Sequence, residues 1–586
     1  MKQVICILSL SFFLFFTSSN AQDCLPNGIT FNSQFEIDNF SSNYPNCIEI
    51  LGSVTINFNV TNLLGLAQIE SIQNSLIINS ANIESLNGLN NLTSIGSTLD
   101  IFNTSLNNLS GLSELESIGG LFKIRNNSNL TNLDGLDSLT EINNSIIIDN
   151  NSITSIGGLN SITSIDGNIE ILDNEFLTHI HGLNSLESID GYFYLTDNSS
   201  LINLEGLNNL TTVTGFFNIT FNESLTSFSG LNNLTEIFGQ TSFGNNPLIT
   251  NFTGLNNLVI VHNTLNVSYN DGLKNFVGLD NIEYIDSFNI QINNSLLNFE
   301  GLEGLQNIGG LFLNGNNSFQ NFQGLHNLTQ VTDGAIAIAG TPITNLNGLD
   351  NLTSITGSLE IRGIDSFVSF EGANNLEITG GLVIINLDNL TSFQGLDNLH
   401  TIGHFYINEC EIIESFNGLE SLTSLNNGSI SIESHQQDNI YSLSGMDNID
   451  YTTIGYLDIK NTNSLSYCSV KSVCDLINYT DSNRYAIHGN LQGCDSPEEI
   501  LENCEPLSID ENQNIDFNIY PNPTNSFFKI NSKLDIEGIK IFSILGKQVK
   551  QFSPQDEYHI TELKDGIYFV MLDTGNKTQF VKLIKK

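Results

Sequence analysis

A glycine followed by an apolar residue recurs through the middle of the chain at an almost constant interval. Seventeen such glycines lie between Gly65 and Gly445, and fifteen of the sixteen intervals between them are 23 or 24 residues. A repeat of about 20 to 29 residues is typical of a solenoid, in which each coil buries its apolar face against the next. The sequence therefore predicts one long repetitive domain, although 586 residues would otherwise suggest about four globular domains.

Each repeat also carries two apolar residues separated by one residue, as in Phe193-Tyr194-Leu195. Alternation with a period of two predicts a short strand with one buried face. The first pair is Val54 and Ile56 and the last is Leu457 and Ile459, which gives 18 coils within residues 53–466. The recurring glycine is expected to relax the backbone at a second corner of each coil.

An asparagine usually follows the second apolar strand position by three residues. An inward asparagine at a bend can bond backbone groups that would otherwise be stranded in an apolar core. We therefore predict a stacked, hydrogen-bonded asparagine ladder. Its members are Asn59 in an early coil and then Asn127, Asn151, Asn174, Asn198, Asn222, Asn246, Asn270, Asn293 and Asn316. Cys410 occupies the same position and is predicted to be a buried structural thiol rather than a reactive one.

The repeat resembles the leucine-rich repeat, whose signature L-x-x-L-x-L-x-x-N/C-x-L accepts Asn or Cys at the ladder position. The short return leg GLxNLTSI looks most like internalin-type repeats and the receptor L-domain. This resemblance implies a mainly β, right-handed, leucine-rich-repeat-like solenoid over residues 53–466. It implies no ligand, because the repeated residues are structural.

The two ends of the solenoid are predicted to be capped and disulfide-bonded. Residues 1–21 read as a signal peptide, with Lys2, an apolar run too short to span a bilayer, and a small-residue cleavage site. Export to an oxidising compartment favours paired cysteines in the caps at residues 22–52 and 467–504. Cys24 is expected to pair with Cys47, whereas Cys468, Cys474, Cys494 and Cys504 allow three connectivities. Short helices are expected after Ser33, over residues 470–478 and from Ser496.

A different pattern follows the polar linker predicted at residues 505–516. Residues 517–586 contain short alternating strands separated by turn residues, which predicts a small antiparallel β-sandwich. Their sequence motifs and the order of these motifs resemble the type A sorting domain of the type IX secretion system. The matching residues are Tyr520, Pro521, Asn522, Pro523, Gly546, Lys547, Gly566 and Tyr568. The resemblance implies recognition by the secretion machinery, passage across an outer membrane, and release or attachment at the surface; the alternative is an ordinary adhesive sandwich.

Charge and motif content exclude several function classes. A net charge of −45 makes nucleic acid an unsuitable partner, because phosphates need basic residues to neutralise them. The chain has no GxSxG, HExxH or phosphate-binding glycine loop, so no enzyme activity and no cofactor are expected. No transmembrane segment and no zinc site are predicted. Calcium at the Asn- and Asp-rich bends stays open, although no EF-hand or GGxGxD spacing is present.

The outward face of the predicted sheet carries the candidate ligand-binding residues. They are Tyr194, Phe312 and Tyr406 on the strands, Phe221 and Tyr269 at the bends, and the basic residues Lys123 and Arg125. Exposed aromatic residues on a rigid sheet suit contact with a protein or a glycan. Alternatively, the basic residues only balance neighbouring acids, as Arg125 could with Asp149 one coil later.

The sequence thus indicates a secreted or cell-surface binding or adhesion protein with a non-catalytic scaffold. An inert structural spacer is the first alternative, and an unrecognised enzyme acting on polysaccharides or peptides is the second. The ligand, the oligomeric state and the choice between release and surface attachment do not follow from the sequence.

Overall fold

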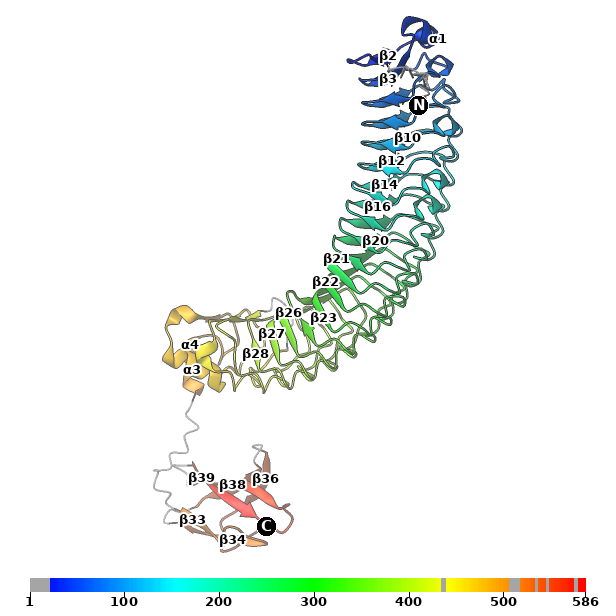
Figure 1. The fold of residues 1–586 in the computed structure, drawn as a ribbon. Coiled ribbons are helices and arrows are strands. Elements are labelled where there is room, and N and C mark those ends of the chain that lie inside the picture. The colour runs from blue at the N-terminus through cyan, green and yellow to red at the C-terminus, as the bar shows by residue number, and fades with distance from the viewer. Residues whose placement is uncertain (1–21, 434–438, 505–516, 533–535, 544–546, 574–577) are drawn as a thin grey trace, which may run out of the picture. The chain divides into compact units, whose positions relative to one another are not determined.

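The computed structural model describes residues 22–433, 439–504, 517–532, 536–543, 547–573 and 578–586. The predicted signal peptide, the predicted linker and Gly546 of the sorting motif lie outside these residues. The chain forms two compact units, divided between Cys504 and Glu505. The larger unit is a curved stack of coils whose main strands line its inner side (Figure 1).

The main parallel ladder confirms the predicted solenoid, because each strand pairs with its counterpart one coil later. Eighteen strands from β4 to β31 correspond to the predicted coils, and β2 and β32 extend the ladder into the two caps. The ladder consists of β2 (Ile29–Phe31), β4 (Val54–Ile56), β6 (Leu76–Asn79), β8 (Leu99–Phe102), β10 (Phe122–Arg125), β12 (Ile146–Asp149), β14 (Ile169–Leu172), β16 (Phe193–Thr196), β18 (Phe217–Thr220), β20 (Thr241–Gly244), β21 (Ile260–Ser268), β22 (Tyr284–Gln291), β23 (Asn307–Asn314), β25 (Ile336–Ala339), β26 (Ser354–Arg362), β27 (Ile378–Ile385), β29 (Phe405–Asn408), β30 (Ser429–Glu433), β31 (Tyr456–Lys460) and β32 (Tyr485–His488).

A second set of short parallel strands, which the sequence analysis did not identify, lies just before the main strand of many coils. Most contain a Ser or Thr followed by a buried Ile or Val, so the same alternation operates over two residues. They are β1 (Gln22–Cys24), β3 (Cys47–Ile50), β5 (Ser71–Ile72), β7 (Ser94–Ile95), β9 (Ser117–Ile118), β11 (Glu141–Ile142), β13 (Ser164–Ile165), β15 (Ser188–Ile189), β17 (Thr212–Val213), β19 (Glu236–Ile237), β24 (Gln330–Val331) and β28 (Thr401–Ile402). In β21, β22, β23, β26 and β27 the two runs merge into one longer strand.

The recurring glycines have a packing role as well as a conformational one. Gly206 adopts φ +127°, in line with the expectation, and a Cβ there would lie 2.0 Å from the carbonyl oxygen of Ile180 in the preceding coil. Gly182 lies in a short 3₁₀ turn without positive φ, yet its Cβ would lie 1.8 Å from the carbonyl oxygen of Ile156. Close approach of successive coils therefore requires glycine even where φ does not. Such turns are η1 (Leu64–Leu66), η2 (Ser110–Leu112), η3 (Gly157–Leu159) and η4 (His181–Leu183).

The asparagine ladder is present from Asn127 to Asn316, with every member buried. Asn222 shows the pattern: its Nδ2 donates to the carbonyl oxygens of Leu195 (2.9 Å) and Thr220 (3.0 Å), and its Oδ1 accepts from the backbone N–H of Asn198 (3.2 Å). The prediction for Asn59 is wrong, because that residue is exposed. Its early coil bends sooner, and buried Ser80 and Thr104 occupy the inner bend in the next two coils.

Cys410 is a buried free thiol, as predicted, and burial raises its pKa to about 12. Its Sγ contacts the carbonyl oxygen of Asn408 at 3.7 Å, so the sulfur occupies the inner side of the bend as the ladder asparagines do.

Short helices cover both ends of the solenoid. At the front, α1 (Gln34–Asp38) and α2 (Phe40–Asn43) follow the predicted cap residue Ser33, and Cys24 is bonded to Cys47. At the rear, the structure selects one of the three open connectivities, pairing Cys468 with Cys494 and Cys474 with Cys504. The rear helices are α3 (Lys471–Tyr479) and α4 (Pro497–Asn503), accompanied by the 3₁₀ turns η5 (Tyr451–Thr453) and η6 (Ser482–Arg484).

The smaller unit contains two antiparallel sheets around one apolar core, as predicted. One sheet orders β33 (Phe517–Tyr520), β34 (Phe527–Ser532) and β37 (Tyr558–His559); the other orders β36 (Gln548–Phe552), β35 (Gly538–Ser543), β38 (Gly566–Asp573) and β39 (Thr578–Lys585). Within the sorting motif, Asn522 ties its turn to the last strand. Its Nδ2 donates to the carbonyl oxygen of Lys582 (2.6 Å), and its Oδ1 accepts from the N–H of Ile584 (2.8 Å).

Candidate binding face of the solenoid

In six consecutive main strands, β16, β18, β20, β21, β22 and β23, the last two outward positions carry only uncharged side chains. The longer strands β21 and β22 also carry His262 and Asp286, but nearer to their starts. We call the residues at the two uncharged positions the neutral strip. Its first row, in strand register, is Tyr194, Asn218, Ser242, Asn266, Asn289 and Phe312. Its second row is Thr196, Thr220, Gly244, Ser268, Gln291 and Asn314.

Charged coils lie on both sides of the neutral strip, directly before its first strand and, after the uncharged β25, two coils beyond its last. Glu170 of β14 pairs with Tyr194 at one end of the strip, and Glu360 and Arg362 of β26 lie two coils beyond Phe312. The strip contrasts with the four coils before it, from β8 to β14, whose strands carry charged residues. These residues are Asp100, Lys123, Arg125, Asp149 and Glu170. Depletion of charge is typical of the central part of an interface.

An aromatic pocket lies at the first end of the neutral strip. Tyr194, Phe216, Asn218, Gln240 and Ser242 line a cavity of about 150 Å³. Tyr192 extends its aromatic wall, with ring centroids 4.7 Å from Phe216 and 6.0 Å from Tyr194. Burial, together with the neighbouring Tyr192 and Glu170, raises the pKa of Tyr194 above its ordinary value.

Amide side chains connect this pocket to the middle of the strip. Gln291 Nε2 donates to Asn289 Oδ1 (2.8 Å), and Asn289 Nδ2 donates to Asn266 Oδ1 (3.0 Å). Asn266 Nδ2 then reaches Ser242 Oγ at 3.4 Å. Within the described part of the chain, the Asn218 Nδ2, the Gln240 amide and the Tyr194 hydroxyl have no protein hydrogen-bond partner, so they are available to a ligand.

The bends at the carboxyl ends of the strands form a separate row with positive φ. Phe221 (φ 56°), Tyr269 (φ 57°) and Ile292 (φ 53°) occupy it, whereas most other coils have Asn, Asp or Gly there and one has Glu409. Bulky residues rarely adopt this conformation, because Cβ crowds the backbone. Phe221 and Tyr269 also expose about half of their surface, at 49% and 48%. The backbone conformation at these bends therefore does not explain why Phe and Tyr are present, and both stay candidate contact residues.

The basic candidates lie outside the neutral strip. Arg125 does not pair with Asp149 as the sequence suggested; it pairs with Asp100 one coil earlier at 2.8 Å and stacks over the Phe102 ring at 4.2 Å. The Asp100 hydrogen bond is the main cause that raises the pKa of Arg125. Lys123 is half-buried on the same strand and has no ion-pair partner among the described residues. Arg125 is thus already occupied within the protein.

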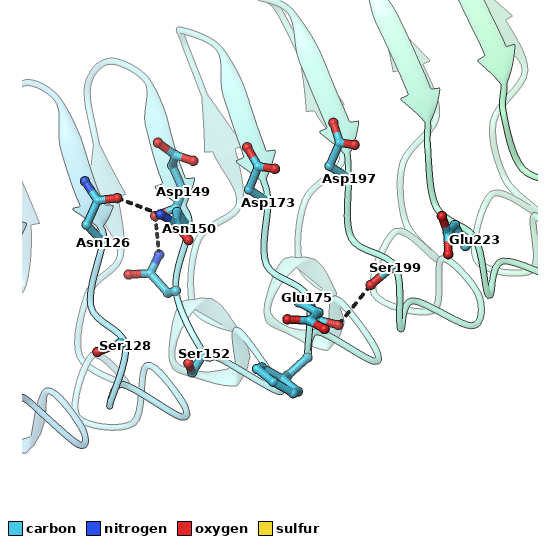
Figure 2. A pocket seen from close by; sticks show the side chains of 12 residues that line it. Asn126, Ser128, Asp149, Asn150, Ser152, Asp173, Glu175, Asp197, Ser199 and Glu223 are labelled. Carbon is cyan, nitrogen blue, oxygen red and sulfur yellow. Dashed lines mark hydrogen bonds between the residues drawn. The ribbon is translucent and has the colours of Figure 1, made fainter.

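An acidic groove of about 780 Å³ runs beside the bends from β10 to β18. Figure 2 shows the carboxylates of Asp149, Asp173 and Asp197 in successive coils, with Glu175 and Glu223 further along the loops. Burial and repulsion from Asp173 raise the pKa of Asp149 above its ordinary value. Across the described residues no three His, Cys, Asp or Glu side chains converge as metal ligands, and the question of calcium stays open.

The structure brings together part of the predicted site. Tyr194 and Phe312 share the first row, as predicted, whereas Tyr406 lies in the same register four strands beyond Phe312. Tyr192 and Phe216, both exposed, were not among the predicted site residues. Each directly precedes the first inward strand residue, so period-two alternation already placed it on the outward face.

The comparisons with known proteins concern mainly the smaller unit. Residues 518–586 match the family described as the secretion system C-terminal sorting domain. No curated protein matches the chain. None of the helices in the described residues has the length and apolar content needed to cross a membrane. The sorting domain indicates that the protein is exported to the outer cell surface or secreted, and that it interacts with the type IX secretion machinery.

Proposed function

We propose that this exported protein is a non-catalytic binding or adhesion protein, and that the neutral strip contacts its ligand. The supporting observation is the register that aligns Tyr194 and Phe312 at the two ends of one uncharged row. Five steps of about 4.8 Å separate them, so the row is roughly 24 Å long. A rigid sheet holds these side chains in place, which lowers the entropy cost of binding.

We also propose that the solenoid is related to leucine-rich repeats and receptor L-domains. The buried asparagine ladder supports this, as does the thiol of Cys410 at the equivalent bend. The short parallel strands on the return side, such as Ser164–Ile165, take the place of longer helices there. Such a solenoid supplies an extended inner surface for recognition.

A non-catalytic role is supported by the chemistry of the strip. Its residues are amides, hydroxyls and aromatic rings, with no carboxylate, histidine or lysine to act as acid or base. The inert-spacer alternative draws support from ion pairs that the protein satisfies internally, including Arg362 with Glu360 and Lys460 with Asp458, each at 2.8 Å. These pairs lie outside the neutral strip, so they do not account for its exposed aromatic residues.

The test is a glycan and protein array probed with the exported protein and with the double variant Tyr194→Ala, Phe312→Ala. We expect the variant to lose the ligand that the parent binds, with unchanged circular dichroism and melting. Asn208→Ala, at an exposed return-leg position, is the control and should bind as the parent does. Equal binding by the double variant would refute the assignment of the strip, and no ligand for the parent would favour the spacer.

A further inference from the structure

We propose that the ligand is an uncharged polysaccharide that lies in extended form along the neutral strip, with one sugar ring in the aromatic pocket. This inference rests on the proposed binding function and adds the ligand class. It follows from three features of the strip: its unused hydrogen-bonding groups, its aromatic wall and its lack of charge.

The hydrogen-bonding groups suit sugar hydroxyls. A hydroxyl both donates and accepts, and a side-chain amide offers two donors and one acceptor. Asn218 Nδ2, the Gln240 amide and the Tyr194 hydroxyl converge on the pocket without protein partners among the described residues. In the relay beyond it, Asn266 and Asn289 each use one amide N–H within the protein, so the second N–H of each can face a ligand.

The aromatic wall suits the apolar face of a sugar ring. Tyr192, Tyr194 and Phe216 lie with ring centroids 4.7 to 6.0 Å apart at the edge of the pocket. A pyranose presents C–H bonds on one face and hydroxyls around its rim, and an aromatic face packs against such a surface while the rim stays hydrogen-bonded. The 150 Å³ cavity is well below the roughly 300–1,000 Å³ of typical small-molecule pockets. It therefore suits one ring of a chain that continues over the open strip.

Phe312 provides a second aromatic contact at the far end of the same row. It is 40% exposed and roughly 24 Å from Tyr194 by strand spacing. Ser242, Asn266 and Asn289 lie between the two aromatic residues. A ligand that uses both aromatics must therefore be a linear polymer several rings long, with polar groups along its whole length.

The charge of the protein surface distinguishes an uncharged polysaccharide from charged ligands. An acidic polysaccharide would meet the acidic groove and the net charge of −45, with Arg125 already paired to Asp100. A basic peptide would be drawn to that groove and away from the strip. An uncharged chain avoids the repulsion, and no net charge draws it toward the groove. Its binding should depend little on salt.

The experiment measures binding of cellohexaose, mannohexaose and laminarihexaose to the exported protein by titration calorimetry, with hexagalacturonate as the acidic probe. We expect at least one neutral hexamer to bind, with similar affinity at low and high salt, and the acidic probe not to bind. Tyr194→Ala with Phe216→Ala should lower the affinity at least about tenfold. Tyr194→Phe should lower it less, because the ring remains.

Tyr467→Ala is the matched control, since Tyr467 is 50% exposed at the start of the rear cap, far along the chain from the neutral strip. It should bind as the parent does, and thermal melting should be unchanged for every variant. If neutral hexamers bind equally to the parent and to Tyr194→Ala, Phe216→Ala, the pocket is wrongly assigned. If no neutral hexamer binds, but a protein on the array binds and is lost with the strip variants, the ligand class is wrong and the binding function stands. Preferential binding of the acidic probe would also overturn the inference.

Discussion

The asparagine ladder allows a quantitative test of the coil register through one substitution, Asn222→Leu. Leucine has a similar size but removes the three side-chain hydrogen bonds that Asn222 makes in the fully buried bend. The N–H of Asn198 loses its acceptor at a site without solvent access. An unpaired buried donor costs about 1–3 kcal/mol, and two further lost bonds at about 0.5 kcal/mol each bring the total to about 2–4 kcal/mol.

The choice of assay follows from the size of the solenoid. At about 2.1 cal/mol/K per residue, cooperative unfolding of residues 22–504 has an entropy of roughly 1 kcal/mol/K, so melting shifts by only about 2–4 °C. Local opening is more sensitive, because 2–4 kcal/mol accelerates amide exchange by roughly 30- to 1,000-fold. Hydrogen exchange of peptides containing Asn198 and Leu195 is therefore the primary measurement.

Asn208→Ala is the matched control, because Asn208 is an exposed asparagine on a return leg. Its exchange and melting should equal those of the parent. If Asn222→Leu leaves both amide exchange around Asn198 and the melting temperature unchanged, then Asn222 does not hydrogen-bond the backbone of the bend and the proposed coil register is wrong.

Three further predictions concern other parts of the chain. Deleting residues 517–586 should leave the protein in the periplasm, as fractionation would show; its appearance at the surface or in the medium would contradict the sorting role. Cys410 should resist thiol reagents at pH 8 until the protein is denatured, and rapid labelling of the native protein would disprove its burial. Because the pKa of this thiol rises from 9.0 to about 12 on folding, the thiol of the unfolded chain ionises first, and the stability of the fold decreases as pH rises above about 9. Non-reducing peptide mapping should recover Cys468 linked to Cys494 and Cys474 linked to Cys504, and any other pairing would contradict the structure of the rear cap. Replacing Cys474 and Cys504 together by Ser should destabilise the rear cap by about 3–4 kcal/mol, because the two cysteines are 30 residues apart.

Repetition explains why so much of the fold followed from the sequence. A period of two in each strand and 23 to 24 residues between most coils place most of the inward strand residues between Val54 and Ile459 without knowledge of distant contacts. Asn59 failed because the first coil is shorter than the repeat that was extrapolated to it. The pairing of Cys468 with Cys494 could not be predicted, since it depends on how the cap helices pack and sequence spacing does not determine that.

The binding face was only partly predictable for a similar reason. Alternation placed Tyr194 and Phe312 in one row, and the same rule applied one step earlier would have identified Tyr192 and Phe216. The partner of Arg125 required the side-chain conformation: strand register sets Asp100 and Asp149 on either side of it, and only the structure shows that Asp100 is chosen. The lack of charge along the two rows of the strip becomes visible only when the outward residues of successive strands are placed in register.

Hydroxyl-radical footprinting of the protein with and without its array-identified ligand tests the central claim most directly. Aromatic side chains react in proportion to their exposure, so Tyr194, Phe216 and Phe312 report on the neutral strip. The proposed function predicts that the ligand protects these three residues while Phe176, 50% exposed beside the acidic groove, reacts as before. Protection of Phe176 or of the return legs, with the three strip residues unchanged, would show that recognition takes place on another face of the solenoid.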